Sequence, residues 1–282
     1  CIDGGIYQGI FAEGIPDLGS ALLRGKMELY NNMPYNLGPG GTTNSVECYF
    51  HIYNILGDPG LALWTGVPTQ LTVTCPTELP QGVNAFNITV TASGAPVQDA
   101  LVCIYNAVIG VQKTAWTNAD GGAVIDLGNL SSGYYAITVT GQNLKPYHAT
   151  LTVSQQSVAL GMDSYTLDDD MIGESSGDGD GQFNPGETVE LLVTLRNTGS
   201  TVTATGISGT ITSADPYLTI AQGTLTGPDA APGAVSPLND DFNLVLSSEA
   251  PHSHIVPILL NAACAQGSWS NIIQLPVVAP LA

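Results

Sequence analysis

The sequence is short of charged residues, and positive charge is the scarcest of all. Charged residues make up 10% of its 282 residues, against about 25% in an ordinary soluble domain. Only 5 Lys and Arg face 24 Asp and Glu, for a net charge of −19. Nucleic acids and anionic membrane surfaces bind proteins through clustered Lys and Arg. The composition therefore argues against nucleic acid and anionic lipid as partners.

Long apolar runs and a cysteine framework are also missing. No stretch approaches the roughly 18 consecutive apolar residues of a transmembrane helix, so we expect no membrane span. The 5 cysteines match no zinc-binding spacing, and their odd number leaves at least one thiol unpaired. Cys75 and Cys103 fall on neighbouring predicted strands, where either a disulfide between them or two free, buried thiols fits the sequence.

What is present indicates a folded, turn-rich protein with more than one core. Apolar residues make up 44% of the chain, which excludes wholesale disorder. A length of 282 residues is enough for two or three domains. The 33 glycines and 18 prolines stay below the low-complexity range of about 25–30%. A poorly charged, turn-rich sequence of this kind is typical of secreted β-rich proteins.

Residues 1–66 differ from the rest of the chain because their periodicity is helical. The elements that they predict are a helix over residues 21–32, capped by Asp17 or Ser20, a second helix over residues 46–56 before a Gly-Asp-Pro stop signal, and a brief strand over residues 61–66. Two helices and one strand cannot close a core of their own. We therefore expect this segment to be the end of an α/β domain whose front half is absent.

From Pro68 onward the apolar period is two, which predicts β-strands. Residues 67–155 are expected to form an immunoglobulin-like (Ig-like) antiparallel β-sandwich, with strands over residues 70–75, 86–92, 100–106, 122–128, 134–141 and 148–153. Residues 188–282 are expected to form a second such sandwich, with strands over residues 189–199, 205–213, 217–225, 239–247, 254–263 and 271–278. The fold class expected from the pattern is mainly β.

An acidic connector, residues 156–187, separates the two predicted sandwiches. Oxygen-bearing side chains stand at alternate positions in its Gly-rich part, and the candidate ligands are Asp169, Asp178, Asp180, Gln182, Asn184 and Glu187. Such spacing lets several oxygens converge on one hard cation, and calcium requires oxygen ligands. The other interpretation is a solvated acidic linker. A calcium ion bound here is expected to set the angle between the sandwiches.

Three groups of residues carry a resemblance to a known family. They are Asp17–Leu22 with Gly25-Lys26 and Tyr53–Leu61 with Leu63-Trp64; Gly94–Val97, Ala100–Val102, Thr117–Gly121, Gly133–Tyr135 and Thr138-Val139; and Asp178–Gly181 with Asn184–Glu187. In this order they resemble the gingipain-like cysteine peptidases secreted by bacteria. The first group is similar to the end of that family's caspase-like catalytic domain, the second to the Ig-like domain after it, and the third to the start of a further Ig-like module.

The resemblance implies a role for the chain outside catalysis. The family's catalytic His, which precedes a Gly, and its nucleophile Cys have no counterparts here, so we expect no catalytic residue. The chain is then the non-catalytic C-terminal region of an extracellular or cell-surface bacterial peptidase, with residues 1–66 as the α/β remnant of the catalytic domain. Its expected role is to stabilise, space or anchor the protease, and its expected partner is the missing catalytic half.

Other functions fit parts of the same sequence. A structural subunit of an extracellular filament or surface layer, a homopolymer in which neighbouring subunits exchange strands or segments, would also bury residues 1–66 against a partner. A lipoprotein acylated at Cys1 and a carbohydrate-binding module are further alternatives.

Overall fold

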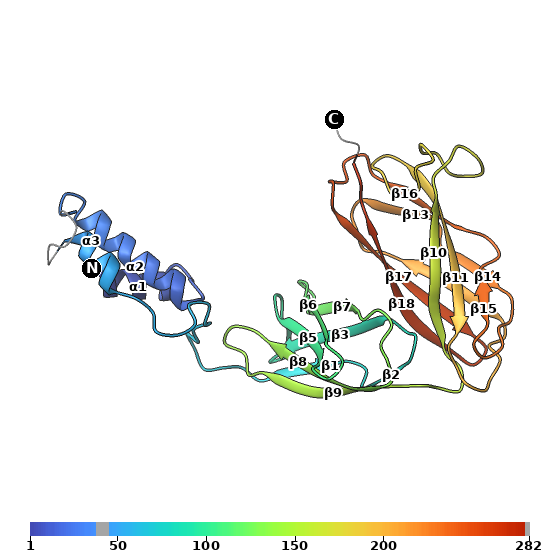
Figure 1. The fold of residues 1–282 in the computed structure, drawn as a ribbon, viewed down its shortest axis with the longest axis horizontal. Helices are drawn as coiled ribbons and strands as arrows, with labels where there is room; N and C mark the ends of the chain where they lie inside the picture. The colour runs from blue at the N-terminus through green and yellow to red at the C-terminus, as the bar shows by residue number, and fades with distance from the viewer. Residues whose placement is uncertain (38–44, 280–282) are drawn as a thin grey trace. The chain divides into compact units, whose positions relative to one another are not determined.

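The computed structural model describes residues 1–37 and 45–279, and it is mainly β (Figure 1). The chain divides into two compact units. The first comprises Cys1–Leu71 with Thr140–Pro146, and the second comprises Thr72–Val139 with Tyr147–Ala282. None of the helices in the described residues has both the length and the apolar character needed to cross a membrane.

The first unit is helical. Its helices are α1 (Ile2–Phe11), α2 (Leu18–Asn32) and α3 (Val46–Ile52). Asp17 caps α2, as expected, because its side chain accepts a hydrogen bond from the backbone N–H of Ser20 at 2.7 Å. Residues 61–66 do not form the predicted strand; they contribute an isolated bridge between Ala62 and Asp17.

Helix α1 was not predicted from the sequence. Its glycines allow it to pack closely against α2, and they also lower its helix propensity. A Cβ atom at Gly25 of α2 would lie 2.6 Å from the Ile2 carbonyl oxygen, and one at Gly5 of α1 would lie 2.9 Å from the Gly25 Cα. The two helices therefore approach so closely that only glycine fits between them. Glycine is a weak helix former, so the residues that make this contact also explain why helix propensity does not predict α1.

The helical unit buries little apolar surface. Its buried cluster consists of Ile2, Leu29 and Val46, with a few partly buried neighbours. Nearly half of the exposed large hydrophobic side chains among the described residues lie in the first 64 positions. A core of this size contributes little stability, so this unit has apolar surface left for a partner.

The strands β1–β9 follow the helical unit. Their bounds are β1 (Leu71–Thr74), β2 (Glu78–Pro80), β3 (Ala85–Ala92), β4 (Ala95–Pro96), β5 (Leu101–Asn106), β6 (Val111–Trp116), β7 (Gly122–Asp126), β8 (Gly133–Thr140) and β9 (Tyr147–Ser154). One sheet has the order β1-β3-β4 with β7 beside β3, and the other has the order β2-β9-β8-β5-β6. The short strands β2, β4 and β6 were not among the predicted ones.

Tyr135 marks this part of the chain as Ig-like. Its ring is fully buried at the start of β8, and its hydroxyl donates a 2.7 Å hydrogen bond to the carbonyl of Ser131. A tyrosine near the start of a strand that bonds back to the backbone a few residues upstream is the tyrosine corner of Ig-like sandwiches. The feature agrees with the predicted fold class.

The strands β10–β18 form the rest of the second unit. Their bounds are β10 (Leu160–Asp168), β11 (Thr188–Asn197), β12 (Ile207–Thr212), β13 (Leu218–Gln222), β14 (Thr224–Gly227), β15 (Val235–Pro237), β16 (Phe242–Leu246), β17 (Ile255–Cys264) and β18 (Gly267–Pro276). They make one sheet of order β10-β11-β16-β13, with β15 beside β11, and another of order β14-β12-β17-β18. Inward side chains from both sheets, such as Leu191 and Leu260, form one buried cluster.

Candidate metal centre

The predicted ligands lie in a loop that connects β10 to β11. These two strands are antiparallel neighbours, and the last residue of β10, Asp168, stands directly opposite Glu190 of β11. The loop over residues 169–187 therefore leaves and re-enters one sheet. The acidic connector predicted over residues 156–187 thus contains strand β10 of this sheet, and a cation bound in the loop would brace the sheet.

Short-range hydrogen bonds from aspartate side chains shape the loop. Asp178 accepts a bond from the N–H of Asp180 at 3.2 Å, and Asp180 accepts one from the N–H of Gln182 at 2.8 Å. Asp170 does the same for the N–H of Ile172 at 2.6 Å. Aspartate favours such turns because its short side chain reaches the backbone two residues on. Repeated turns of this kind fold an acidic segment tightly enough to bring its carboxylates together.

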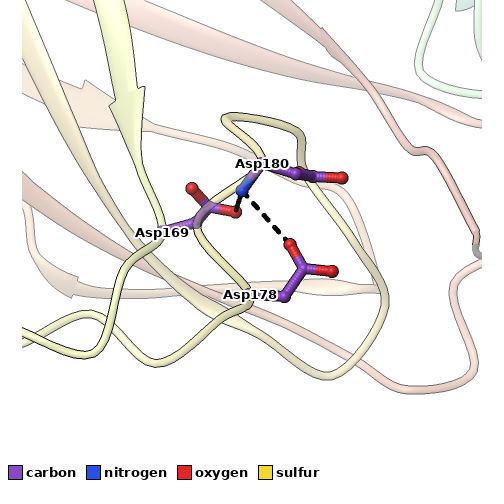
Figure 2. A group of neighbouring side chains, drawn as sticks. All are labelled: Asp169, Asp178 and Asp180. Atoms are coloured by element: carbon purple, nitrogen blue, oxygen red, sulfur yellow. Dashed lines mark hydrogen bonds between the residues drawn. The ribbon is translucent and has the colours of Figure 1, made fainter.

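Asp169 anchors the loop from inside. Its side chain is buried and accepts hydrogen bonds from the backbone N–H groups of Gly181, at 2.9 Å, and Asp180, at 3.2 Å. Figure 2 shows the carboxylates of Asp169 and Asp178 on either side of the Asp180 backbone nitrogen. The first residue after β10 is thereby tied to the centre of the loop.

Three of the six predicted ligands come together in this way. Carboxylate oxygens of Asp169, Asp178 and Asp180 all lie within 4.8 Å of one another. Three negative charges at this spacing repel one another. A divalent cation between them would convert this repulsion into attraction.

Glu187 and Asn184 lie at the other end of the loop. The Glu187 carboxylate accepts a hydrogen bond from the Asn184 backbone N–H at 3.3 Å. Burial raises the pKa of the Glu187 carboxyl above its ordinary value, and the charges of Asp169 and Asp178 add to the rise. A Cβ atom at Gly177 would lie 2.4 Å from the Asp169 carbonyl oxygen and 3.0 Å from the Glu187 Cδ, so glycine is required there. Glu187 therefore borders the aspartate cluster.

The Asn184 side chain provides an independent sign of a ligand. The residue is 6% exposed, and its Oδ1 atom is buried without a hydrogen-bond partner. Leaving a buried carbonyl oxygen unpaired costs about 1–3 kcal/mol. A hard cation within reach of this oxygen would satisfy it.

Gln182, the remaining predicted ligand, is turned toward Asp180. Its side-chain amide donates a 2.6 Å hydrogen bond to Asp180 Oδ2. Both residues are exposed. Gln182 thus binds the Asp180 carboxylate through its amide nitrogen.

The basic residues that the structure describes form no ion pair with this loop. Within residues 1–37 and 45–279, no Lys, Arg or His forms an ion pair with residues 168–190. Arg196, the basic residue nearest in sequence, pairs with Asp163 at 2.6 Å. The negative charge of the loop is therefore not offset by an ion pair within the described residues.

The predicted disulfide between Cys75 and Cys103 is absent, because all five cysteines are free thiols. Cys75 follows β1 of one sheet, whereas Cys103 lies in β5 of the other. Its neighbours Val102 and Ile104 are fully buried, so alternation along the strand turns Cys103 away from the facing sheet. Burial raises the pKa of the Cys75 thiol, which lowers its reactivity.

No hydrogen bond joins a cysteine to a histidine in the described residues. Cys1 is exposed at the start of α1 and makes no side-chain capping bond. His254 bonds to Asp215 at 2.7 Å, and His252 accepts a bond from the Ala279 N–H at 3.1 Å. His252 and His254 are thus engaged with partners other than a thiol.

Two buried polar residues beside the loop were not predicted as functional. Glu190 and Asn243 are 9% and 4% exposed, respectively. A glutamate between Val189 and Leu191 reads in the sequence as a solvent-facing strand position. The pairing of β11 with β16, which sets Glu190 opposite Asn243, has no local sequence signal.

Comparison with known proteins finds likeness at the level of fold only. No family model matches the sequence, and no curated protein matches it. The crystal structure of the Arg-specific cysteine proteinase gingipain R aligns over 54% of this chain, with a TM-score of 0.44 and 19% identity. The alignment spans 33% of the gingipain R chain.

Two other solved structures give similar or lower scores. The complex of the pro- and mature domains of Porphyromonas gingivalis RgpB aligns over 49% of this chain and 30% of its own, with a TM-score of 0.39 and 20% identity. The BSP domain of a biofilm-associated protein aligns over 75% of this chain and 30% of its own, with a TM-score of 0.28 and 13% identity.

Proposed function

We propose that this chain is a calcium-stabilised, non-catalytic region of a secreted gingipain-like cysteine peptidase. The observation that carries the calcium part is the convergence of Asp169, Asp178 and Asp180 within 4.8 Å. Glu187 borders this cluster, and the same loop carries the unpartnered Oδ1 of Asn184. Calcium takes six to eight oxygen ligands from carboxylates, carbonyls and water, and this donor set fits it.

The calcium ion would act through the core of the β10–β18 sandwich. Phe183, in the same loop, is 1% exposed and belongs to the buried cluster. Its carbonyl accepts a 3.0 Å hydrogen bond from the Val278 N–H, which ties the loop to the chain after β18. Holding the loop closed therefore keeps a large aromatic side chain in the core. Calcium binding becomes folding free energy because the unfolded chain lacks the site.

The role beside a peptidase rests on the sequence motifs and on the helical unit. Residues 17–26 and 53–64 resemble the closing part of a gingipain-like catalytic domain, and the exposed apolar side chains of α1–α3 need a partner. The remaining part of such a domain would cover them. The Ig-like strands would then stabilise, space or anchor the enzyme at an extracellular or cell-surface location.

Calcium titration tests the first half of the proposal. Calcium added to the metal-stripped protein is expected to raise the melting temperature, and Asp178→Asn is expected to reduce the increase. Asp120→Asn, an exposed turn aspartate in the strand set β1–β9, is the matched control and should respond like the wild type. An unchanged melting temperature in the wild-type protein would rule out the calcium site.

Assembly measurements test the second half. The rival function is a structural subunit of an extracellular filament, in which a neighbouring copy covers the helical unit. Light scattering and electron microscopy of the purified chain should show monomers that bind a separately produced gingipain-like catalytic fragment in a one-to-one complex. Ordered polymers of the chain alone would favour the filament and overturn the peptidase role.

A further inference from the structure

A row of polar side chains crosses the outer face of the sheet β10-β11-β16-β13. The strand register sets Asp168 opposite Glu190, Glu190 opposite Asn243, and Asn243 opposite Gln222. Directly opposed residues project to the same face with Cβ atoms about 4.5–5.5 Å apart. Val189 and Leu191, which flank Glu190, point into the core, so the row lies on the face away from the core.

The loop between β10 and β11 covers the middle of this row. The backbone N–H of Glu174 donates a 2.6 Å hydrogen bond to Glu190 Oε1. The side-chain amide of Asn243 donates to Glu174 Oε2. These two contacts close the loop over Glu190 and Asn243, which explains why outward-facing strand residues are 9% and 4% exposed.

The covered row concentrates negative charge. Asp168, Glu174, Glu190 and the nearby Asp241 contribute four carboxyl groups, and none forms an ion pair in the described parts of the chain. Burial raises the pKa of Asp241, and the charge of Glu190 is the next cause, followed by Asp240 and Glu174. Like charges directly opposed across strands destabilise a sheet, so the pairing of Asp168 with Glu190 needs compensation.

The second sign of a ligand is the amide of Asn243. Its nitrogen is used by Glu174, while its Oδ1 atom is buried and has no hydrogen-bond partner. Asn184 Oδ1 is the one other buried side-chain nitrogen or oxygen atom in this condition among residues 1–37 and 45–279. Each of the two unpaired oxygens thus belongs to a residue whose hydrogen bonds connect it to a separate group of carboxylates.

We propose that Glu174, Glu190 and Asn243 form a second calcium site, with Asp241 and Asp168 adding negative charge. Glu190 Oε2, Glu174 Oε1 and Asn243 Oδ1 are the oxygens left free by the hydrogen bonds of the cluster. Carboxylate and amide oxygens are the ligands of hard cations. A calcium ion here would fasten the loop to β11 and β16 and offset the charge opposition across β10 and β11.

This site is distinct from the Asp169 cluster, although one loop serves both. Asp168 lies in the row on the outer face of the sheet, whereas the next residue, Asp169, turns into the loop and binds Asp180 and Gly181. Two consecutive aspartates thereby contribute to two separate groups. The proposal goes beyond the function proposed above, and either site can exist without the other.

Calcium stoichiometry tests the proposal. Native mass spectrometry and isothermal titration calorimetry of the metal-stripped full chain are expected to find two bound calcium ions. Glu190→Gln should lose one of them, because it removes a charged ligand. Asp178→Asn should lose the other and keep the ion held by Glu190. Glu249→Gln, an exposed loop residue, removes the same charge and should retain both ions.

A second variant guards against a folding defect. Glu174→Gln changes an exposed loop residue and should also reduce the stoichiometry from two to one, with an unchanged circular dichroism spectrum. Without calcium, Glu190→Gln should melt no lower than the wild type, because it relieves repulsion. One ion in the wild type, lost in Asp178→Asn, would overturn the second site and leave the first intact. Two ions retained in both Glu190→Gln and Glu174→Gln would also overturn it.

Discussion

The aspartate cluster makes a quantitative prediction that separates an anchoring residue from a pure ligand. Asp169 is buried and accepts two backbone hydrogen bonds. Asp178 is exposed and accepts one, at 3.2 Å from the Asp180 nitrogen. Both belong to the group within 4.8 Å. Replacing each by asparagine should therefore remove the same ion but different hydrogen bonds.

The expected loss for Asp169→Asn without calcium follows from its two bonds. A hydrogen bond to a charged group contributes about 1.5–3 kcal/mol. Asparagine would keep a neutral acceptor for one of the two backbone N–H groups, but its own N–H donor would face the other. The net loss from the bonds is then about 2–3 kcal/mol. Relief of repulsion from Asp178 and Glu187 returns about 1 kcal/mol, so the free energy of unfolding should fall by about 1–2 kcal/mol. For Asp178→Asn the two terms nearly cancel, and a change under about 0.5 kcal/mol is expected.

Calcium bound at the aspartate cluster adds a stabilising contribution that both variants should lose. A ligand at 100 times its Kd stabilises the native state by about 2.7 kcal/mol. The assay is urea unfolding in EDTA and in calcium, followed by fluorescence, because Trp269 packs against the core of the β10–β18 sandwich. Equal losses for the two variants in EDTA would refute the anchoring role of Asp169. A calcium increment in Asp169→Asn as large as that of the wild type would refute the site itself.

Three further predictions concern the rest of the chain. Tyr135→Phe should lower the free energy of unfolding by about 1 kcal/mol, whereas Tyr134→Phe, at an exposed position, should stay within about 0.5 kcal/mol of the wild type. Burial raises the pKa of Tyr135, so the wild type should lose stability as the pH rises above about 10. The stability difference between the wild type and Tyr135→Phe should then shrink, and a difference that stays constant with pH would contradict the buried hydroxyl. Gly25→Ala should reduce the helical circular dichroism signal because its Cβ would overlap Ile2, whereas Gly4→Ala, with open space around it, should not; equal spectra would contradict the close helix contact. Thiol titration of the denatured, unreduced protein should find five reactive cysteines, and a count of three would restore the disulfide.

The sequence predicts the strands whose two faces differ in burial, and it misses the strands whose two faces are exposed to a similar degree. β3 and β8 alternate buried with exposed or half-buried side chains along most of their length, and both were expected. β10 exposes Asp163–Thr166 in succession, so its segment reads as part of an acidic connector. β6 alternates between half-buried and exposed residues at the edge of its sheet, which leaves too little apolar contrast to predict a strand.

Some contacts in the candidate site are local in sequence and were predictable, whereas others join distant residues and were not. Asp178 and Asp180 were identified because two-residue spacing in a Gly-rich loop is a local property, and the hydrogen bonds that bring them together also span two residues. Gln182 follows the same spacing but binds Asp180 through its amide, which spacing alone does not reveal. Asn243 was missed because its contact with Glu174 joins residues 69 positions apart.

The register of β10 against β11 connects these observations with the net charge of the protein. Nine of the 24 acidic residues fall between Asp163 and Glu190, and folding brings the ends of this segment together by placing Asp168 opposite Glu190. An arginine or lysine in the loop would relieve this repulsion within the chain, but the segment's one close ion pair, between Arg196 and Asp163, lies near the far end of β10. A calcium ion at the proposed sites would offset this repulsion, so removal of calcium is expected to open the loop over residues 169–187 before the remaining core unfolds.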